Sequence, residues 1–241
     1  MVAAFLLGGG LQRISGMGTG IVAGPILALS LGPVIGVLTT NTAAIATAAV
    51  LTISLRAHVD WGRVAMICGL GTLGIIAGVA VIHAVTSAWL EVLIAVLLLA
   101  GLALTSFRLG SHPGRARSID AASGFTGGLM NALVGMAGPI LVMDSRITGW
   151  DHVRFAASLQ PIFLVLNTVS VLAKLVPGLP PGSTLPPWWV IPVVIAAVLT
   201  GAGIGGRLAK RIPAHRARTL AIVVATAGSI SLLVKGLSAL I

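Results

Sequence analysis

The chain has 241 residues, of which 57% are hydrophobic and only 8% are charged. A water-soluble domain needs more polar surface than this, so the composition excludes a soluble globular protein. The apolar residues form long runs instead of short alternating stretches, which predicts helices that cross a membrane and excludes a membrane β-barrel. The 15 Lys and Arg outnumber the 5 Asp and Glu and cluster between the apolar runs. We expect these charges to orient the helices and to meet anionic lipid, and not to bind nucleic acid.

The first half of the chain begins with a broken segment. Two apolar runs, 1–11 and 21–31, stand on either side of a polar and glycine-rich stretch. A helix of that length spans about 16 Å, close to half of a bilayer core of about 30 Å. The alternative is one long helix whose glycines allow close packing. Three full membrane spans are predicted next, at 34–55, 64–85 and 90–107.

The second half repeats this order. A short apolar run at 121–134, a glycine break at 135–139 and a second short run at 140–143 come first. The sequence Gly-Met-Gly-Thr-Gly at 16–20 aligns without a gap with Gly-Met-Ala-Gly-Pro at 135–139. Spans are then predicted at 155–176, 188–208 and 220–240. The middle span of each half carries a GxxxG pair, Gly74 with Gly78 and Gly201 with Gly205.

This order predicts an all-α polytopic membrane protein with two repeats and about eight membrane segments. Residues 1–241 form a single transmembrane domain, in which repeat one covers 1–108 and repeat two covers 121–241. The basic stretch 109–120 connects them. Each repeat consists of a broken or re-entrant helix followed by three transmembrane helices.

The basic residues distinguish two topologies. If all eight segments cross the membrane, seven basic residues lie on each side, which leaves no positive-inside bias. If both broken segments re-enter on the side from which they came, twelve basic residues share the cytoplasmic side and only Lys174 and Lys235 face outward, with Arg13 inside the membrane. Three crossings per half then make the repeats inverted. Charge favours the re-entrant interpretation, and the fully crossing one stays open.

The two breaks predict an anion site. A broken helix presents unpaired N–H groups and a positive dipole end inside the membrane, and glycine lets a ligand approach the backbone. Arg13 needs a partner there, and because the adjacent runs hold no acid, we expect an anionic substrate; alternatively, Arg13 reaches the membrane surface. Each polar group inside a span could also hold helices together. The predicted substrate-binding residues are Gln12, Arg13, Gly16, Gly18, Thr19, Gly20, Thr39, Thr40, Asn41, Asn131, Gly135, Ala137, Gly138, Ser158, Gln160 and Asn167.

The sequence predicts no enzyme, no cofactor and no metal site. It contains no HExxH, nucleophile elbow or P-loop, and Cys68 is its only cysteine. The carboxylates stand at the ends of the predicted segments, which also argues against a cation carrier or an acidic proton relay. These carboxylates are Asp60, Glu91, Asp120, Asp144 and Asp151.

Several stretches resemble the sulfite exporter TauE/SafE family of membrane permeases. They are the two glycine-rich breaks, Thr39-Thr40-Asn41, Val59-Asp60-Trp61, and the run from Gly201 to Arg211, and they follow the family order over nearly the whole chain. The resemblance implies a permease of the bacterial inner membrane for sulfite, sulfonates or related sulfur and organic oxyanions. Thr19, Ala137, Arg13 and the proline-rich loop 177–187 depart from the family pattern, so the particular substrate stays open.

The resulting hypothesis is a secondary carrier or facilitator for a small anion. Without an ATP site in this chain, transport would use the gradient of the substrate or of a coupled proton or other ion. A channel of the same fold is one alternative. A membrane scaffold or biogenesis partner without transport activity is another, although it leaves the matching breaks unexplained.

Overall fold

The computed structural model describes residues 1–15, 19–104, 116–181, 183–208 and 214–240, without the side chains of residues 12–15, 19, 21, 214, 215, 217 and 218. These residues form α-helices and one short 3-10 turn, and they contain no strand. The helices are α1 (Val2–Ser15), α2 (Thr19–Leu31), α3 (Pro33–Leu55), α4 (Trp61–Ala84), α5 (Ser87–Leu104), α6 (Ala116–Val134), α7 (Gly138–Thr148), α8 (His152–Leu175), α9 (Val190–Leu208) and α10 (Ala214–Ser238). The turn is η1 (Arg56–His58).

Six helices are long and apolar enough to cross a membrane, and each matches a full span predicted from the sequence. They lie within α3, α4, α5, α8, α9 and α10. In α1 and α2 the apolar parts, Val2–Leu11 and Val22–Leu31, are too short to cross alone. The protein is therefore a multi-pass helical membrane protein.

The helices begin and end where local chemistry predicts. The Asp60 side chain accepts a hydrogen bond from the Arg63 backbone N at 3.3 Å, and Asp151 accepts one from the Arg154 backbone N at 3.0 Å. These aspartates are the N-caps of α4 and α8. At the other end of an element, Gly149 ends α7 in the left-handed conformation, with φ +64°.

The first break is narrower than the sequence predicts. Helix α1 continues to Ser15 and α2 begins at Thr19, so Gln12 and Arg13 belong to a helix, while Gly16 and Gly18 lie outside the described residues. In the second half, α7 runs to Thr148 instead of ending near residue 143. The sequence pattern stops at Asp144 because a charge interrupts the apolar run, but in the fold Arg63 pairs with Asp144 and allows the helix to continue.

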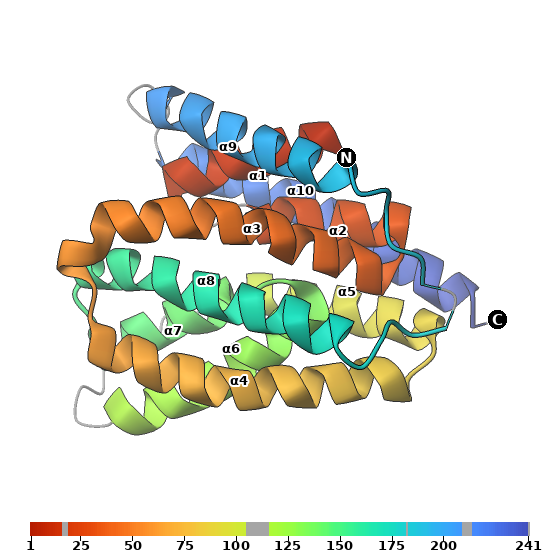
Figure 1. Cartoon of the computed structure of the whole chain (residues 1–241), viewed down its shortest axis with the longest axis horizontal. Helices are drawn as coiled ribbons and strands as arrows, with labels where there is room; N and C mark the ends of the chain where they lie inside the picture. Colours follow the sequence, from red (N-terminus) through yellow and green to blue (C-terminus); the bar gives the residue numbers. More distant parts are fainter. Residues whose placement is uncertain (16–18, 105–115, 182, 209–213, 241) are drawn as a thin grey trace.

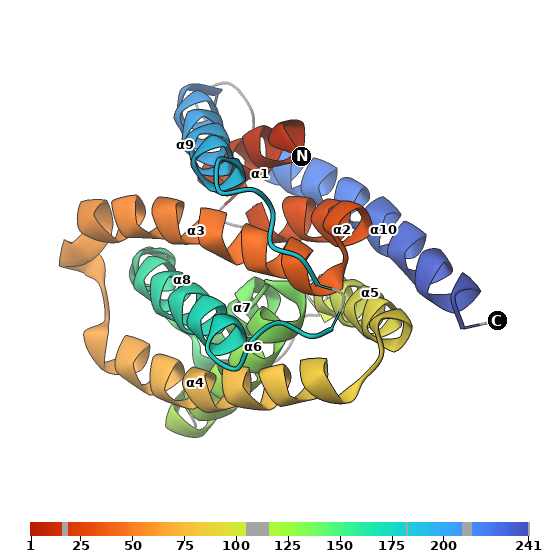
Figure 2. The same cartoon turned by 45° about the vertical axis from the view of Figure 1, so that its right-hand side comes forward.

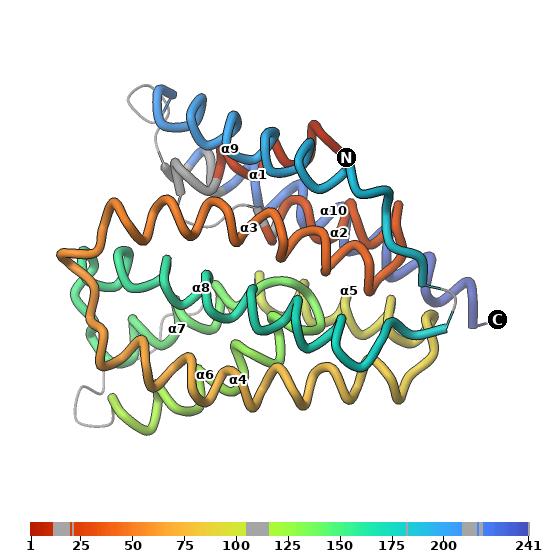
Figure 3. Tube along the Cα trace, in the orientation of Figure 1, coloured from red at the N-terminus to blue at the C-terminus, as the bar shows by residue number. Residues whose placement is uncertain are grey.

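Each break joins two helices into a hairpin, and the two hairpins point in opposite directions. In Figure 1, α1 starts at the right, by the N-terminus, and α2 returns to that side. Helix α6 starts at the left and α7 returns to the left. The Cα trace in Figure 3 shows the same courses. Within each hairpin the two helices pack against each other.

Glycine faces hold the hairpins against helices from the opposite half of the chain. Helix α4 packs on α6, and a Cβ added at Gly74 would overlap the carbonyl oxygen of Phe125. Helix α9 packs on α1, and a Cβ added at Gly201 would overlap the carbonyl oxygen of Leu6. Small residues permit such backbone contact between membrane helices. The GxxxG pairs therefore fix where both hairpins lie.

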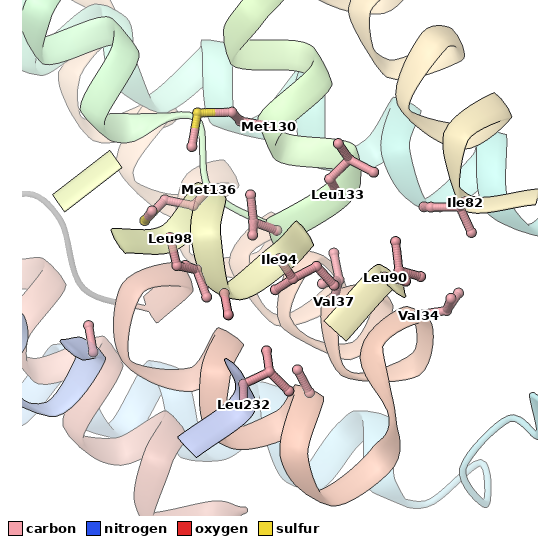
Figure 4. Close-up of a cluster of buried hydrophobic side chains, with 14 of the residues drawn as sticks. Val34, Val37, Ile82, Leu90, Ile94, Leu98, Met130, Leu133, Met136 and Leu232 are labelled. Atoms are coloured by element: carbon pink, nitrogen blue, oxygen red, sulfur yellow. The ribbon is translucent and has the colours of Figure 1, made fainter. Parts of the chain in front are cut away.

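Two clusters of buried apolar side chains lie at the contacts of α9 with α1 and of α4 with α6, and a third lies between them. One includes Phe5, Leu27 and Val198, from α1, α2 and α9. A second includes Ile67, Leu141 and Ile162, from α4, α7 and α8. Figure 2 shows α1, α2 and α9 on one side of α3, and α4, α6, α7 and α8 on the other. Figure 4 shows the third cluster, where α3, α4, α5, α6 and α10 meet; its labelled residues are Val34, Val37, Ile82, Leu90, Ile94, Leu98, Met130, Leu133, Met136 and Leu232.

The glycine packing can be tested within one helix. In Gly74→Ala the new methyl group overlaps the backbone of α6, so we expect destabilisation of about 1–3 kcal/mol and a lower melting temperature in detergent. Gly69→Ala is the matched control, because nothing lies within 4 Å of a Cβ at that position of α4. Equal melting temperatures for the two variants would contradict this packing.

Candidate functional site

The first turn of α2 meets the second break inside the protein. Gly20, in the first turn of α2, lies so close to the turn between α6 and α7 that an added Cβ would be 2.5 Å from the carbonyl oxygen of Gly135. One turn further along α2, a Cβ at Gly24 would be 3.4 Å from the carbonyl oxygen of Val134. Gly135 has φ +70°, a conformation that strains any other residue. The start of α2 therefore touches the tip of the second hairpin, which enters from the opposite end.

Helix α3 passes beside this meeting point and presents Asn41 to it. A Cβ at Gly135 would lie 2.9 Å from Asn41 Oδ1 and 3.8 Å from Thr40 Cγ2. The Asn41 amide donates to Ser170 Oγ at 2.9 Å and to the Asn131 carbonyl oxygen at 3.4 Å. A single buried side chain therefore connects α3 with α6 and α8.

Helix α8 contributes a buried polar face on the other side of Asn41. Gln160, Asn167 and Lys174 are spaced seven residues apart and share this face with Ser170. Lys174 is only 2% exposed, and its Nζ donates to Ser170 Oγ at 2.8 Å. A hydrogen-bonded chain thus runs from Lys174 through Ser170 to Asn41, at the tip of the second hairpin.

Several amide atoms around this chain have no hydrogen-bond partner among the described residues. They are Asn41 Oδ1, Asn131 Nδ2, Asn167 Oδ1 and Gln160 Oε1. Leaving a buried polar group unpaired costs about 1–3 kcal/mol, so such groups are few in native proteins. These amides belong to α3, α6 and α8 and make this buried polar region a candidate site for a polar ligand.

The structure brings some of the predicted residues together and gives others local partners. Gly20, Thr40, Asn41, Asn131 and Gly135 surround the meeting point. The hydroxyl groups of Thr39 and Thr40 donate to backbone carbonyls one turn earlier, and Ser158 Oγ accepts from the Asp60 backbone N at 2.9 Å. Ala137 and Gly138 are buried at the start of α7. The side chains of Gln12, Arg13 and Thr19, and residues Gly16 and Gly18, lie outside the described part of the chain.

Sequence reasoning missed Ser170 and Lys174. It counted Lys174 only as one of the two basic residues that face outward in the re-entrant topology. The available signal was the seven-residue spacing of Gln160, Asn167 and Lys174, which places them on one helix face with Ser170.

A second buried polar cluster lies at the start of α4. The Arg63 guanidinium pairs with both Asp120 and Asp144, donates to Thr148 Oγ1 at 2.9 Å, and stands 3.7 Å from the centre of the Trp150 ring. Asp120 and Asp144 are 2% and 1% exposed. These two carboxylates are therefore inside α6 and α7 and not at exposed segment ends, because Arg63 compensates their burial.

Arg63 supplies one positive charge for two carboxylates. Asp144 lies outside the six spanning helices. Burial, and after it the nearby charge of Asp120, raises the pKa of Asp144 from 3.8 to about 7, although the positive charge of Arg63 acts to lower it. Asp144 also borders a cavity of about 560 Å³ between α5, α6 and α7. The cluster can therefore take up a proton near neutral pH.

This pKa predicts a pH dependence of stability. Between about pH 4 and pH 7 the folded protein holds a proton on Asp144 that the unfolded chain releases, so stability falls as the pH rises through this window. In Asp144→Asn the amide does not titrate, and we expect the decline of the melting temperature between pH 5 and pH 7.5 to become shallower. Asp151→Asn is the control, because it changes an exposed helix cap instead. An unchanged slope in Asp144→Asn would contradict the assignment.

The spans, the paired hairpins and the buried polar chain define a multi-pass membrane protein with a polar site enclosed by its helices. The model of the family described as Sulfite exporter TauE/SafE matches residues 1–232. The chain therefore belongs to the sulfite exporter TauE/SafE family, a family of membrane transporters for sulfur anions. A small-molecule substrate and membrane lipid are its partners. No curated protein and no solved structure matches the chain.

Proposed function

We propose that the protein is a secondary carrier or facilitator for a small anion, namely sulfite, a sulfonate or a related sulfur or organic oxyanion. The anion binds where the two hairpin tips meet. One observation carries this proposal: Gly20 and Gly135, from opposite halves of the chain, are in contact beside the buried amides of Asn41 and Asn131. Glycine backbone and amide side chains supply the close approach and the hydrogen bonds that an oxyanion needs.

The packing supports two inverted repeats. Helix α4 packs on α6 as α9 packs on α1, while α3 packs on α8 and α5 on α10. Exchanging the halves therefore maps each of these four contacts onto another of them or onto itself. The hairpins open toward opposite ends of the bundle (Figure 1), as inverted repeats require. We infer three crossings and one re-entrant hairpin in each repeat.

The charges orient this arrangement in the bacterial inner membrane. η1, the first turns of α4 and α8 and the last turn of α7 lie at one end of the bundle and carry Arg56, Arg63, Arg154 and Arg146. Lys174 belongs to the last turn of α8, at the opposite end. By the positive-inside rule, the arginine-rich end is cytoplasmic. Transport would alternate access to the site from the two ends.

Flux into proteoliposomes tests the proposal directly. We expect saturable, protein-dependent uptake of radiolabelled sulfite or sulfoacetate, and none of ammonium, with and without a pH gradient. Acetate tests whether a carboxylate is accepted. Counterflow would identify a carrier, whereas flux without saturation would identify a channel. Absence of any anion flux, from protein shown to be folded and inserted, would favour a membrane scaffold instead.

The tip of the second hairpin provides a sharper test. In Gly135→Ala the new side chain is strained by the positive φ and would lie 2.9 Å from Asn41 Oδ1, so we expect anion flux to fall about tenfold or more. Gly178→Ala introduces the same type of strain, at φ +88°, in a loop where nothing lies within 4 Å. Wild-type flux in Gly135→Ala would place the site elsewhere.

A further inference from the structure

Lys174 lacks the carboxylate partner that Arg63 and Lys235 have. Arg63 pairs with Asp120 and Asp144, and Lys235 Nζ lies 2.6 Å from Glu91 Oε1 with its side chain still 47% exposed. Lys174 is 2% exposed, and none of the five Asp and Glu side chains, all of which are described, lies within 4.0 Å of it. It is a buried amine without a described carboxylate partner.

A hydroxyl group offsets little of the free energy needed to bury an ammonium ion. A buried ammonium ion needs an opposite charge or several strong hydrogen-bond acceptors to stay charged away from water. An ammonium has three N–H donors, and the described residues give Lys174 one acceptor, Ser170 Oγ at 2.8 Å. The remaining donors and the charge are therefore available to a ligand.

The position of Lys174 ties it to the hairpin tips. Ser170 Oγ, which holds the amine, also accepts from the Asn41 amide at 2.9 Å, and Asn41 Oδ1 is the atom that faces Gly135. Asn131, which accepts from Asn41 through its backbone, has an unpaired side-chain amide nitrogen. One charge and one free amide donor thus stand at the two ends of the same buried chain.

We infer that Lys174 supplies the positive charge that binds the substrate anion, an inference that rests on the proposed anion transport. Lys174 donates to an oxygen of the anion, and Ser170 holds its Nζ in position. An ammonium is a compact charge without the fork geometry of a guanidinium, so it suits small oxyanions of different shapes. The sequence hypothesis gave this role to Arg13 alone.

Lys174→Met separates this role from a structural one. Removing a buried charge in favour of an apolar side chain of similar length leaves stability unchanged or raises it. We therefore expect the variant to melt at or above the wild-type temperature and yet to lose sulfite flux about tenfold or more. Added sulfite should raise the melting temperature of the wild-type protein, because it binds only the folded state, and should not raise that of Lys174→Met.

Two further variants complete the experiment. Lys174→Arg keeps the charge, so we expect it to retain sulfite-dependent stabilisation with a weaker apparent affinity. The double variant Glu91→Gln with Lys235→Met removes the other lysine at this end together with its partner, and should transport as the wild type does. If Lys174→Met does not fold, Ser170→Ala, which frees the amine but keeps its charge, should weaken sulfite affinity.

The outcomes distinguish the two proposals. Wild-type KM and sulfite stabilisation in Lys174→Met would overturn the role of Lys174 and leave anion transport intact. Loss of flux only in Arg13→Gln, and not in Lys174→Met, would show that Arg13 supplies the positive charge that binds the anion. Absence of both flux and sulfite stabilisation in the wild-type protein would overturn the proposed function itself.

Discussion

Contact between helix backbones at glycine faces is the constraint on which the rest of this structure depends. Lipid offers no hydrogen bonds, so an interrupted helix can exist at membrane depth only when protein surrounds it. Gly74 lets α4 lie directly on α6, and Gly201 lets α9 lie directly on α1. These contacts hold each hairpin along its length. They leave its tip free to meet the other tip at Gly20 and Gly135.

The buried charges divide between the two ends of the bundle. At the arginine-rich end, Arg63, Asp120 and Asp144 form a compensated cluster beside a cavity. Toward the other end, Lys174 is buried, and the one hydrogen-bond acceptor that the described residues offer its Nζ is Ser170 Oγ. The first arrangement stabilises the start of α4 against α6 and α7. The second concentrates uncompensated positive charge, which is the local chemistry that attracts an anion.

The sequence predicts the long spans well because length and hydropathy alone determine them, as for α3 and α8. It also predicts the second break, since Gly135 has a conformation that glycine favours. Prediction from sequence fails where the environment of a residue depends on partners that are far away in the chain. Asp144 looks like the end of an apolar run until Arg63, far away in sequence, is placed beside it. Lys174 counts only as an outward-facing charge until its spacing from Gln160 and Asn167 places it on the buried polar face of α8.

The pairing of each hairpin with a helix of the other half has a consequence for biosynthesis. Helix α1 is synthesised long before the glycine face against which it packs, because that face belongs to α9. The apolar parts of α1 and α2 are each too short to cross a bilayer alone, and α1 gains this packing partner only when Val190–Leu208 has been inserted. Helix α1 is thus made early and held in place late.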